Sequence, residues 1–216
     1  MAIFSYESKF SRVMMVISQS CYLNLLWFVC SIPVFTLGAS TTALYDVALK
    51  IARGDDAEIG RRFFASFKSN FKQATQIWLV LLLIGIVLGT DIYVLNHLRD
   101  FATGPLAVVE TIALAMVIAA CIAYAIVHIY VWPLTASVEN TNFQMIKNSF
   151  LIGTHYLFCT ICVFCIYAAM AFLIIAFFTP LFILGVGLCA VLSSYLLNPV
   201  IRVSSYDPNR NRELTD

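Results

Sequence analysis

Three cysteines at three-residue spacing form the pattern in this sequence that comes closest to a chemical site. Cys159, Cys162 and Cys165 make a CxxCxxC run, and His155 stands one helical turn before it. Thiolates at this spacing on one helix face could bind a soft metal ion or part of an iron–sulfur cluster. No compact set of further ligands follows, and the run lies inside an apolar stretch, where a thiol behaves as a small hydrophobic group. We therefore expect the cysteines to pack structurally, and we predict neither a metal site nor a cofactor.

Polar residues within apolar stretches are the second group that could carry chemistry, because ionisable groups in a bilayer usually mark ion or proton pathways. They are scarce here and comprise Asn24, Asp91, His97, Glu110 and His128. Asp91, His97 and Glu110 could together line an outward vestibule, or they could mark the water interface, which is the interpretation that we favour. The sequence contains no Walker loop, no HExxH or GxSxG motif and no paired intramembrane carboxylates. These absences predict a protein that is not an enzyme.

The composition identifies the class of protein that must position these residues. Of 216 residues, 61% are hydrophobic and only 12% are charged, and the mean hydropathy is +0.88. A soluble domain is roughly 45–50% apolar and about 25% charged. These values exclude a disordered chain, a nucleic-acid-binding protein and a soluble enzyme core. They predict an all-α integral membrane protein whose main partner is the lipid bilayer.

Five apolar stretches are long enough to span a membrane, which needs about 20 residues of helix. We expect a polytopic bundle of five transmembrane helices, forming a single membrane domain over residues 1–216. The third stretch is long and should tilt or bend near Pro133, and Thr179-Pro180 should separate the last two. The predicted spans are residues 14–36, 75–95, 105–134, 156–178 and 180–203.

The basic residues predict the orientation of this bundle, because cytoplasmic loops are enriched in Lys and Arg. With five spans, ten basic residues collect on one side of the membrane and three on the other. The richer side contains the connection between the first two spans and the C-terminus. The chain is therefore expected to have its N-terminus outside and its C-terminus in the cytoplasm. This orientation requires Lys9 and Arg12 to be carried across the membrane.

The cytoplasmic connection over residues 39–74 is predicted to be helical. Ser40 can cap a first helix over residues 41–53, and Gly54-Asp55-Asp56 indicates a turn. A second helix places aromatic side chains at four-residue spacing among basic ones, a pattern typical of a helix on an anionic membrane surface. Alternatively, the aromatic rings pack on the protein's own cytoplasmic face. The candidate surface for a partner or for the membrane comprises Arg61, Arg62, Phe63, Phe67, Lys68, Phe71 and Lys72.

Small residues at four-residue spacing predict close helix packing within the membrane. Gly85 and Gly89 form one such pair in the second span, and Ala115, Ala119 and Ala123 form a stripe in the third. A second amphipathic helix is expected within residues 136–155. Residues 67–71 resemble residues 146–150, and this faint repeat favours an arrangement of two parallel hairpins with one extra helix.

Two segments resemble a known family. Residues 22–45, which contain Tyr22-Leu-Asn-Leu-Leu-Trp27, Ser31-Ile-Pro33 and the run from Thr36 to Tyr45, resemble the opening of the YesL family of bacterial membrane proteins. The run from Phe63 to Ala74 resembles the same family before its second span. The resemblance implies about five helices, a bacterial cytoplasmic membrane and no established activity. It also implies an accessory role, because members of the family are often encoded beside carbohydrate ABC importers.

Two functions from different classes follow as hypotheses. The first is a non-catalytic accessory subunit that contacts the permease or ATPase subunit of a carbohydrate ABC importer through residues 39–74. The alternative is a small solute carrier or channel, which requires a polar path through the bundle. The first is favoured because the sequence offers little for such a path beyond Asn24, Asp91 and Glu110. No nucleic-acid partner is expected.

Overall fold

The computed structural model describes residues 9–55, 58–99, 104–176 and 182–204, and it confirms the predicted all-α class. No strand occurs among these residues. The elements are α1 (Lys9–Ser31), the 3-10 turn η1 (Val34–Thr36), α2 (Leu37–Arg53), α3 (Ile59–Arg99), α4 (Pro105–Ser137), α5 (Asn142–His155), α6 (Leu157–Ala176) and α7 (Phe182–Ser204).

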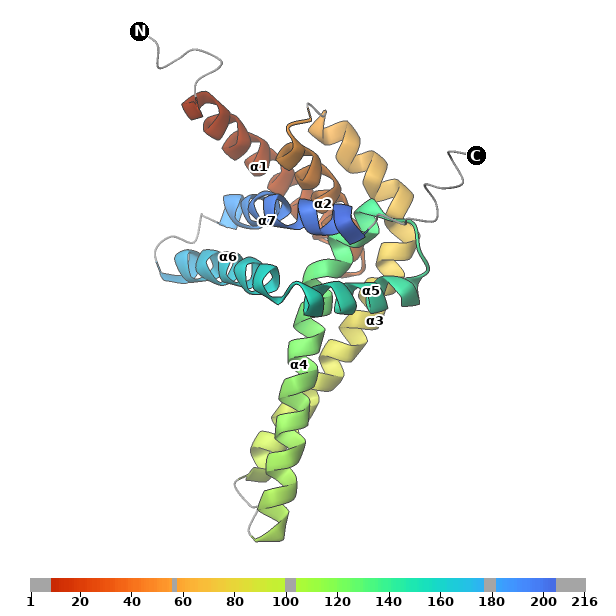
Figure 1. Cartoon of the computed structure of the whole chain (residues 1–216), viewed down its shortest axis with the longest axis vertical. Helices are drawn as coiled ribbons and strands as arrows, with labels where there is room; N and C mark the ends of the chain where they lie inside the picture. The colour runs from red at the N-terminus through yellow and green to blue at the C-terminus, as the bar shows by residue number, and fades with distance from the viewer. Residues whose placement is uncertain (1–8, 56–57, 100–103, 177–181, 205–216) are drawn as a thin grey trace.

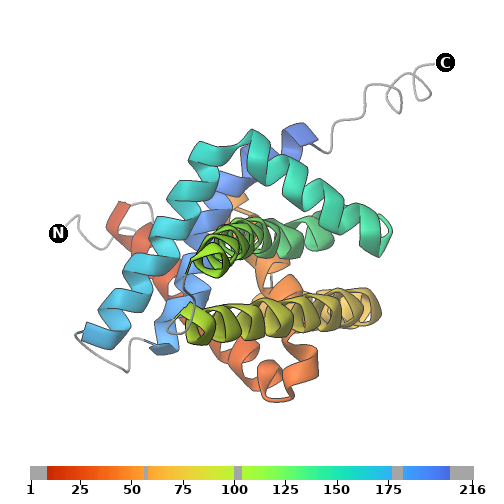
Figure 2. The same cartoon turned by 90° about the horizontal axis from the view of Figure 1, so that it is seen from below.

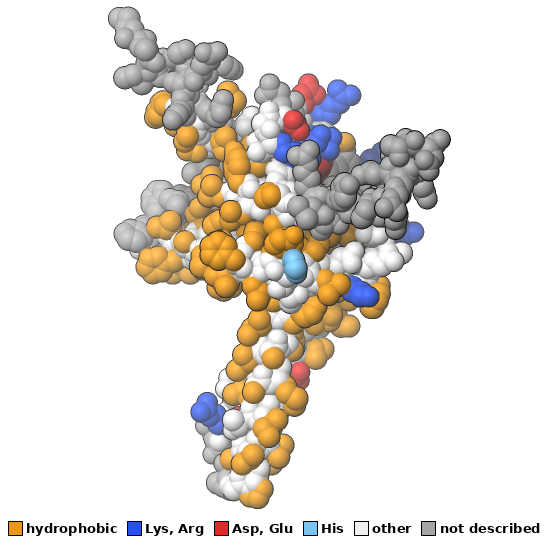
Figure 3. All heavy atoms as spheres, in the orientation of Figure 1, with side chains coloured by type: hydrophobic (Ala, Val, Ile, Leu, Met, Phe, Trp, Pro, Cys, Tyr) orange, Lys and Arg blue, Asp and Glu red, His pale blue; other side chains and the backbone are white. Residues whose placement is uncertain are grey.

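Four of these helices are long and apolar enough to cross a membrane. They are α1 from Val13 onward, α3, α4 and α6, while α7 contributes a shorter apolar stretch, Gly185–Ile201. Large apolar side chains are exposed along all of them, as Figure 3 shows for the face in view. An exposed apolar surface of this extent needs lipid or other helices to cover it. The chain is therefore a membrane protein, with four candidate spans against the five predicted.

The longest element is α3, and it joins two elements that the sequence predicts separately. Its 41 residues include both the second predicted span and the preceding aromatic–basic segment. At ~1.5 Å per residue it extends about 60 Å, twice the ~30 Å of a hydrocarbon core. No Gly or Pro stands between Phe71 and Trp78 to interrupt it. In Figure 1, α3 and α4 form an antiparallel hairpin whose far end projects beyond the other helices.

Helix α2 is the most deeply placed element, although the sequence predicts a helix on the cytoplasmic surface. It packs against α1, α3, α4 and α7, and small residues allow these helices to approach closely. A Cβ on Gly38 would meet the carbonyl oxygen of Ala74 and the side chain of Trp78 on α3. Ser40 lies inside α2 rather than capping it, and its hydroxyl bonds to the Leu37 carbonyl. Its buried residues are Gly38, Ala39, Ser40, Thr42, Ala43, Leu44, Tyr45, Val47, Ala48, Leu49 and Ile51.

The first three helices alternate in direction. The Trp27 indole N–H donates to the Thr41 hydroxyl at 3.1 Å, and the Ser31 and Ser40 hydroxyls lie 2.7 Å apart. These bonds hold α1 and α2 antiparallel, and α3 runs antiparallel to α2 in turn. The beginning of α1 and the turn after α2 therefore lie at the same end of the molecule. This pairing conflicts with the predicted arrangement, in which one membrane span separates the N-terminus from all of residues 39–74.

Helices α6 and α7 form a second antiparallel pair, which lies crosswise to the α3–α4 hairpin in both Figure 1 and Figure 2. The Asn24 side-chain oxygen accepts the backbone N–H of Gly187 at 3.0 Å and so joins α7 to α1. At its other end α7 contacts α2, because Arg53 donates to the Asn198 side-chain oxygen at 2.8 Å. The break predicted at Thr179-Pro180 lies outside the described residues.

Candidate functional site: a polar cavity beside a basic helix face

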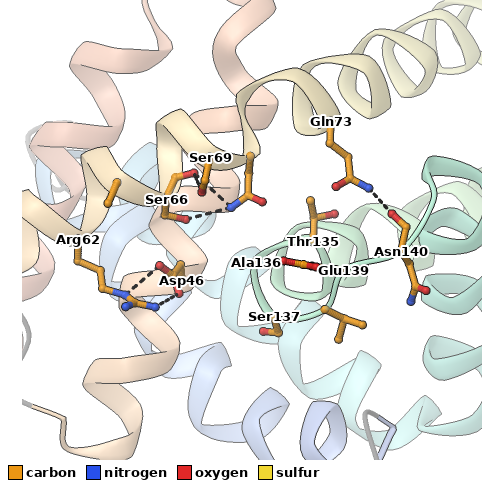
Figure 4. A pocket seen from close by; sticks show the side chains of 13 residues that line it. Asp46, Arg62, Ser66, Ser69, Gln73, Thr135, Ala136, Ser137, Glu139 and Asn140 are labelled. Carbon is orange, nitrogen blue, oxygen red and sulfur yellow. Dashed lines mark hydrogen bonds and ion pairs between the residues drawn. The ribbon is translucent and has the colours of Figure 1, made fainter. Parts of the chain in front are cut away.

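A cavity of about 700 Å³ lies between α3 and the end of α4 with its connection to α5 (Figure 4). Ten of its thirteen lining residues are polar, which is unusual because ligand pockets are mostly apolar. The α3 wall is a stripe of side chains at three- and four-residue spacing, so that they share one helix face. The polar lining residues are Asp46, Arg62, Ser66, Ser69, Asn70, Gln73, Thr135, Ser137, Glu139 and Asn140.

An ion pair between α2 and α3 forms one end of the cavity. Arg62 Nε and Nη2 donate to the two carboxylate oxygens of Asp46, each at 3.0 Å. The Asp46 side chain is 12% exposed and that of Arg62 is 40% exposed. A bidentate pair of this kind fixes both the distance and the orientation of the two helices. Its charges cancel, so Arg62 is a structural contact rather than a free surface charge.

The tyrosine beside this pair points away from the cavity into the core. The Tyr45 hydroxyl lies 2.8 Å from that of Tyr167 on α6. Burial raises the pKa of the Tyr45 phenol, because the protein interior disfavours the phenolate. Tyr45 is therefore a neutral hydrogen-bonding residue that links α2 to α6.

A hydroxyl–amide cluster forms the middle of the α3 wall. The Asn70 side-chain N–H donates to the Ser66 carbonyl at 3.2 Å and to the Ser66 hydroxyl at 3.3 Å. The Ser69 hydroxyl donates to the same carbonyl at 3.1 Å. These bonds hold the side chains against their own helix, and Ser66, Ser69 and Asn70 all line the cavity.

The opposite wall is attached to α3 by two amide contacts. The Gln73 side-chain N–H donates to the Asn140 carbonyl at 2.6 Å, and the Asn142 side-chain N–H donates to Gln76 at 2.8 Å. Residues 138–141 thereby become an ordered wall rather than a loose connection. Glu139 is exposed on this wall and forms no ion pair with a described residue.

The polar stripe of α3 ends where its apolar stretch begins. Beyond Gln73, the buried positions of α3 form an apolar seam and are at most 1% exposed: Ala74, Ile77 and Leu81. Farther along the helix, α3 meets α4 through the rings of Trp78 and Trp132, whose centroids lie 6.2 Å apart. The lining of the cavity does not extend past Gln73 on α3.

The structure separates the predicted aromatic–basic surface into two parts. Phe63 is completely buried, and Phe67 and Phe71 are half-buried beside it, with Phe67 packed against the core. Phe63 therefore packs inside the protein rather than on a surface, whereas the half-buried Phe67 and Phe71 leave the choice between membrane and protein surface a prediction. Of the predicted basic residues, Arg61, Lys68 and Lys72 remain exposed on the outer side of α3.

Sequence reasoning missed Phe64. Its side chain is 53% exposed and shares the outward stripe with Arg61, Lys68 and Lys72 at spacings of three and four residues. We call these four residues the outward stripe. Phe64 directly follows Phe63 but lies outside the four-residue repeat of Phe63, Phe67 and Phe71. An interpretation based on that repeat alone therefore does not include it.

The residues predicted to permit close helix packing differ in their surroundings. A Cβ on Gly85 would lie 3.0 Å from the Tyr124 hydroxyl of α4, so this glycine permits a close helix approach. Gly89 has open space around it. Ala115 and Ala119 are exposed and Ala123 is half-buried. A close helix contact at Ala115 and Ala119 stays a prediction, and the contacting helix would belong to another molecule.

The polar residues of the apolar stretches lie apart from the cavity. Asn24 is 2% exposed and joins α1 to α7, while Asp91 and His97 are exposed. Glu110 is 8% exposed, and its Oε1 has no hydrogen-bond partner. His128 lies within an aromatic cluster, with its ring 5.6 Å from that of Trp132.

The cysteine run does not assemble a metal site in the part of the chain that the structure describes. Cys159 and Cys162 are half-buried on α6, and Cys165 is exposed. No group of three or more potential His, Cys, Asp or Glu ligands occurs among the described residues.

Comparison with known proteins adds one finding. Residues 21–92 match the family model described as "Protein of unknown function, DUF624". The match covers a third of the 216 residues and includes about half of α1, all of α2 and most of α3. It therefore contains Asp46, Arg62 and the whole α3 wall of the cavity. No curated protein and no solved structure matches the chain.

Proposed function

We propose that this chain is a non-catalytic accessory subunit that docks on a partner through the outward stripe of α3. The observation that carries the proposal is the separation of polar and apolar surface along that helix. Its first part carries the polar cavity wall on one side and exposed cations on another, whereas its later part is apolar. An accessory subunit needs a surface that binds its partner and a segment that anchors it in the membrane, and this division of α3 provides both. The resemblance to the YesL family directs the proposal to the permease or ATPase of a carbohydrate ABC importer in a bacterial cytoplasmic membrane.

The chemistry of the outward stripe suggests the surface that it would meet. The Arg61 side chain is 87% exposed, and its contact with Glu58 at 3.6 Å is a surface ion pair that contributes little. Lys68 and Lys72 are exposed too. Exposed cations around an aromatic ring suit an acidic partner surface with an apolar patch for Phe64, because aromatic and Arg side chains are enriched where proteins meet.

The alternative function is a small solute carrier or channel. A carrier needs a polar route between the two sides of the membrane, and the cavity supplies only its beginning. The lining ends at Gln73 on α3, and the contact of the Trp78 and Trp132 rings beyond it weighs against a route between α3 and α4. The buried amide of Asn24 is engaged with Gly187, which also favours a packing role over solute binding.

The experiment that tests docking compares charge reversals at and away from the stripe. The tagged protein is purified in mild detergent from its own membranes after light crosslinking, as wild type, as the double variant Lys68→Glu/Lys72→Glu, and as Lys147→Glu on α5. We expect importer subunits at near-stoichiometric amounts with the wild type and with Lys147→Glu, and at least a tenfold loss with the double variant. Equal recovery by all three would refute docking through the stripe. Solute flux in vesicles containing the purified wild type alone would favour the carrier.

The antiparallel pairing of α1 and α2 leads us to propose a different orientation in the membrane from the one that the sequence predicts. The start of α1, the turn after Arg53 and the region of Asn198 all lie at one end of the molecule, and the α3–α4 tip with Arg99 lies at the other. Because basic residues favour the cytoplasm, we propose that the N-terminus is cytoplasmic together with that end. Lys9 and Arg12 then need not cross the membrane.

A split fluorescent protein tests this orientation. The short fragment is fused to the N-terminus or, as a control, to the C-terminus, and the large fragment is expressed in the cytoplasm. We expect fluorescence from both fusions. A dark N-terminal fusion with a fluorescent C-terminal one would restore the orientation predicted from the five spans.

A further inference from the structure

We propose that the polar cavity receives an extended polypeptide segment of the docked partner, with acidic residues toward its α3 edge. This inference rests on the proposed function, because the partner that supplies the segment is the one held by the outward stripe. The cavity would be a second part of that interface. The segment in it would be held by hydrogen bonds to its backbone rather than by an apolar side chain.

The length of the cavity fits such a segment. Its α3 wall runs from Arg62 to Gln73, a rise of about 16 Å at ~1.5 Å per residue. An extended chain advances ~3.3 Å per residue, so the wall spans about five residues of it. The cavity therefore has the dimensions of a short strand laid along the helix.

The lining chemistry fits a polypeptide backbone. Each residue of an extended chain presents one N–H donor and one C=O acceptor, and a side-chain amide offers both kinds of group. On the α3 wall, the side chains of Ser69, Asn70 and Gln73 each donate to a protein carbonyl, so their oxygens are available to accept from the N–H groups of a segment. Figure 4 shows Asn140 on the opposite wall. The three apolar lining residues are small or branched and form no pocket for a large side chain.

A free small solute suits this cavity less well than a tethered segment. Each hydrogen bond from the lining to a solute replaces one to water, so the net gain per bond is small. A free solute must also lose its translational freedom, and only three of the lining residues are apolar and could compensate for that loss by burial. A segment of a partner already held at Lys68 and Lys72 has lost that freedom, and its effective concentration at the cavity is high.

The charges around the cavity favour acidic residues at one edge. Arg62 is neutralised by Asp46, whereas Lys68 and Lys72 are exposed immediately beside the lining positions Ser69 and Gln73. The α3 edge is therefore cationic. An acidic side chain in the segment meets complementary charge there, and like charges would oppose a basic segment.

The first test is a photocrosslink from inside the cavity. A photoreactive phenylalanine analogue replaces Glu139, which is an exposed lining residue, or His155 as an exposed control on α5, in the full chain within its own membranes. We expect the probe at Glu139 to crosslink to one short, acidic, extended stretch of the partner and the probe at His155 not to reach it. A crosslink only to lipid, while the partner still co-purifies, would overturn the inference and leave the proposed function intact.

The second test fills the cavity from either wall. Ser69→Trp on α3 and Ala136→Trp on α4 place a ring in the cavity, and His155→Trp is the matched control. A synthetic peptide of the crosslinked stretch is titrated onto the purified protein in lipid nanodiscs, with thermal stability recorded for every variant. We expect at least tenfold weaker peptide binding by both filled variants, and unchanged binding by His155→Trp.

The two proposals can fail separately. If the filled variants keep their stability and bind the peptide like the wild type, the segment does not occupy the cavity, whatever the outward stripe does. If the wild type co-purifies with no partner under crosslinking, the proposed function is refuted and the inference falls with it.

Discussion

The assignment of Phe63 to the core and of Phe64 to the docking surface makes a prediction about two neighbouring residues of the same type. Phe63 is completely buried and its ring lies 5.7 Å from that of Phe64 and 6.3 Å from that of Phe67. Truncation of a buried Phe to Ala costs ~3–5 kcal/mol through lost burial and the cavity left behind. Phe64 is 53% exposed, so Phe64→Ala should cost only about 1 kcal/mol.

The difference between the two variants is therefore about 2–4 kcal/mol, which corresponds to about 5–15 °C in Tm for a chain of this size. The assay heats each variant in detergent and measures the folded fraction by size-exclusion chromatography. Phe63→Ala should show the larger fall in Tm, and Phe64→Ala should lose only about 2–4 °C while losing partner recovery. Equal Tm values for the two variants would refute the division of the helix faces on which the docking proposal depends.

Two further predictions concern contacts between helices. Arg62→Gln leaves the nearly buried Asp46 carboxylate without its partner and should cost about 1.5–3 kcal/mol, whereas the double variant with Asp46→Asn should cost less, as a double-mutant cycle in thermal unfolding would reveal. Gly187→Ala places a Cβ against the Ser20 carbonyl oxygen and should cost ~1–3 kcal/mol because backbone must move. Gly89→Ala, with open space around it, should instead gain up to ~1 kcal/mol of helix propensity in the same assay; a loss at Gly89 as large as that at Gly187 would contradict the packing described.

The positions of the apolar helices could be predicted from the sequence because span length and proline placement are local properties. The start of α4 coincides with Pro105, as the third predicted span requires, and α6 lies within the fourth. The burial of α2 could not be predicted in this way. After Leu37, its first turn and the next consist of Gly, Ala, Ser and Thr residues, which hydropathy does not rank as core. They are buried because their small side chains let α1 and α3 approach α2 closely. This burial depends on the sequences of all three helices, not on that of α2 alone.

The extent of α3 was missed for a related reason. The change from polar to apolar residues after Gln76 marks a change of surroundings, whereas a helix ends only where its backbone is interrupted. The cavity needs still more information, because Gln73 and Asn140 are 67 residues apart in the chain. The α3 wall of the cavity can be recognised in the sequence, because its polar residues recur at helical spacing among Phe63, Phe67 and Phe71. Its opposite wall depends on how α4 returns along α3, and no periodicity in either segment encodes that register.

Thr75 offers a test of the idea that α3 passes from a binding surface to an anchor without a break. It stands among the last polar residues of α3, beside Ala74 of the apolar seam, and its hydroxyl oxygen is buried with no hydrogen-bond partner. Thr75→Val keeps the branched shape and removes the unsatisfied hydroxyl, so it should raise stability by about 1–2 kcal/mol in thermal unfolding of the purified protein. Thr75→Ser, which keeps the hydroxyl and removes the methyl group, is the matched control and should lower stability. If Thr75→Val were destabilising in membranes but stabilising in detergent, the hydroxyl would have a partner supplied by the membrane-embedded assembly. The transition on α3 would then be a contact point with that assembly, rather than only the place where its surroundings change.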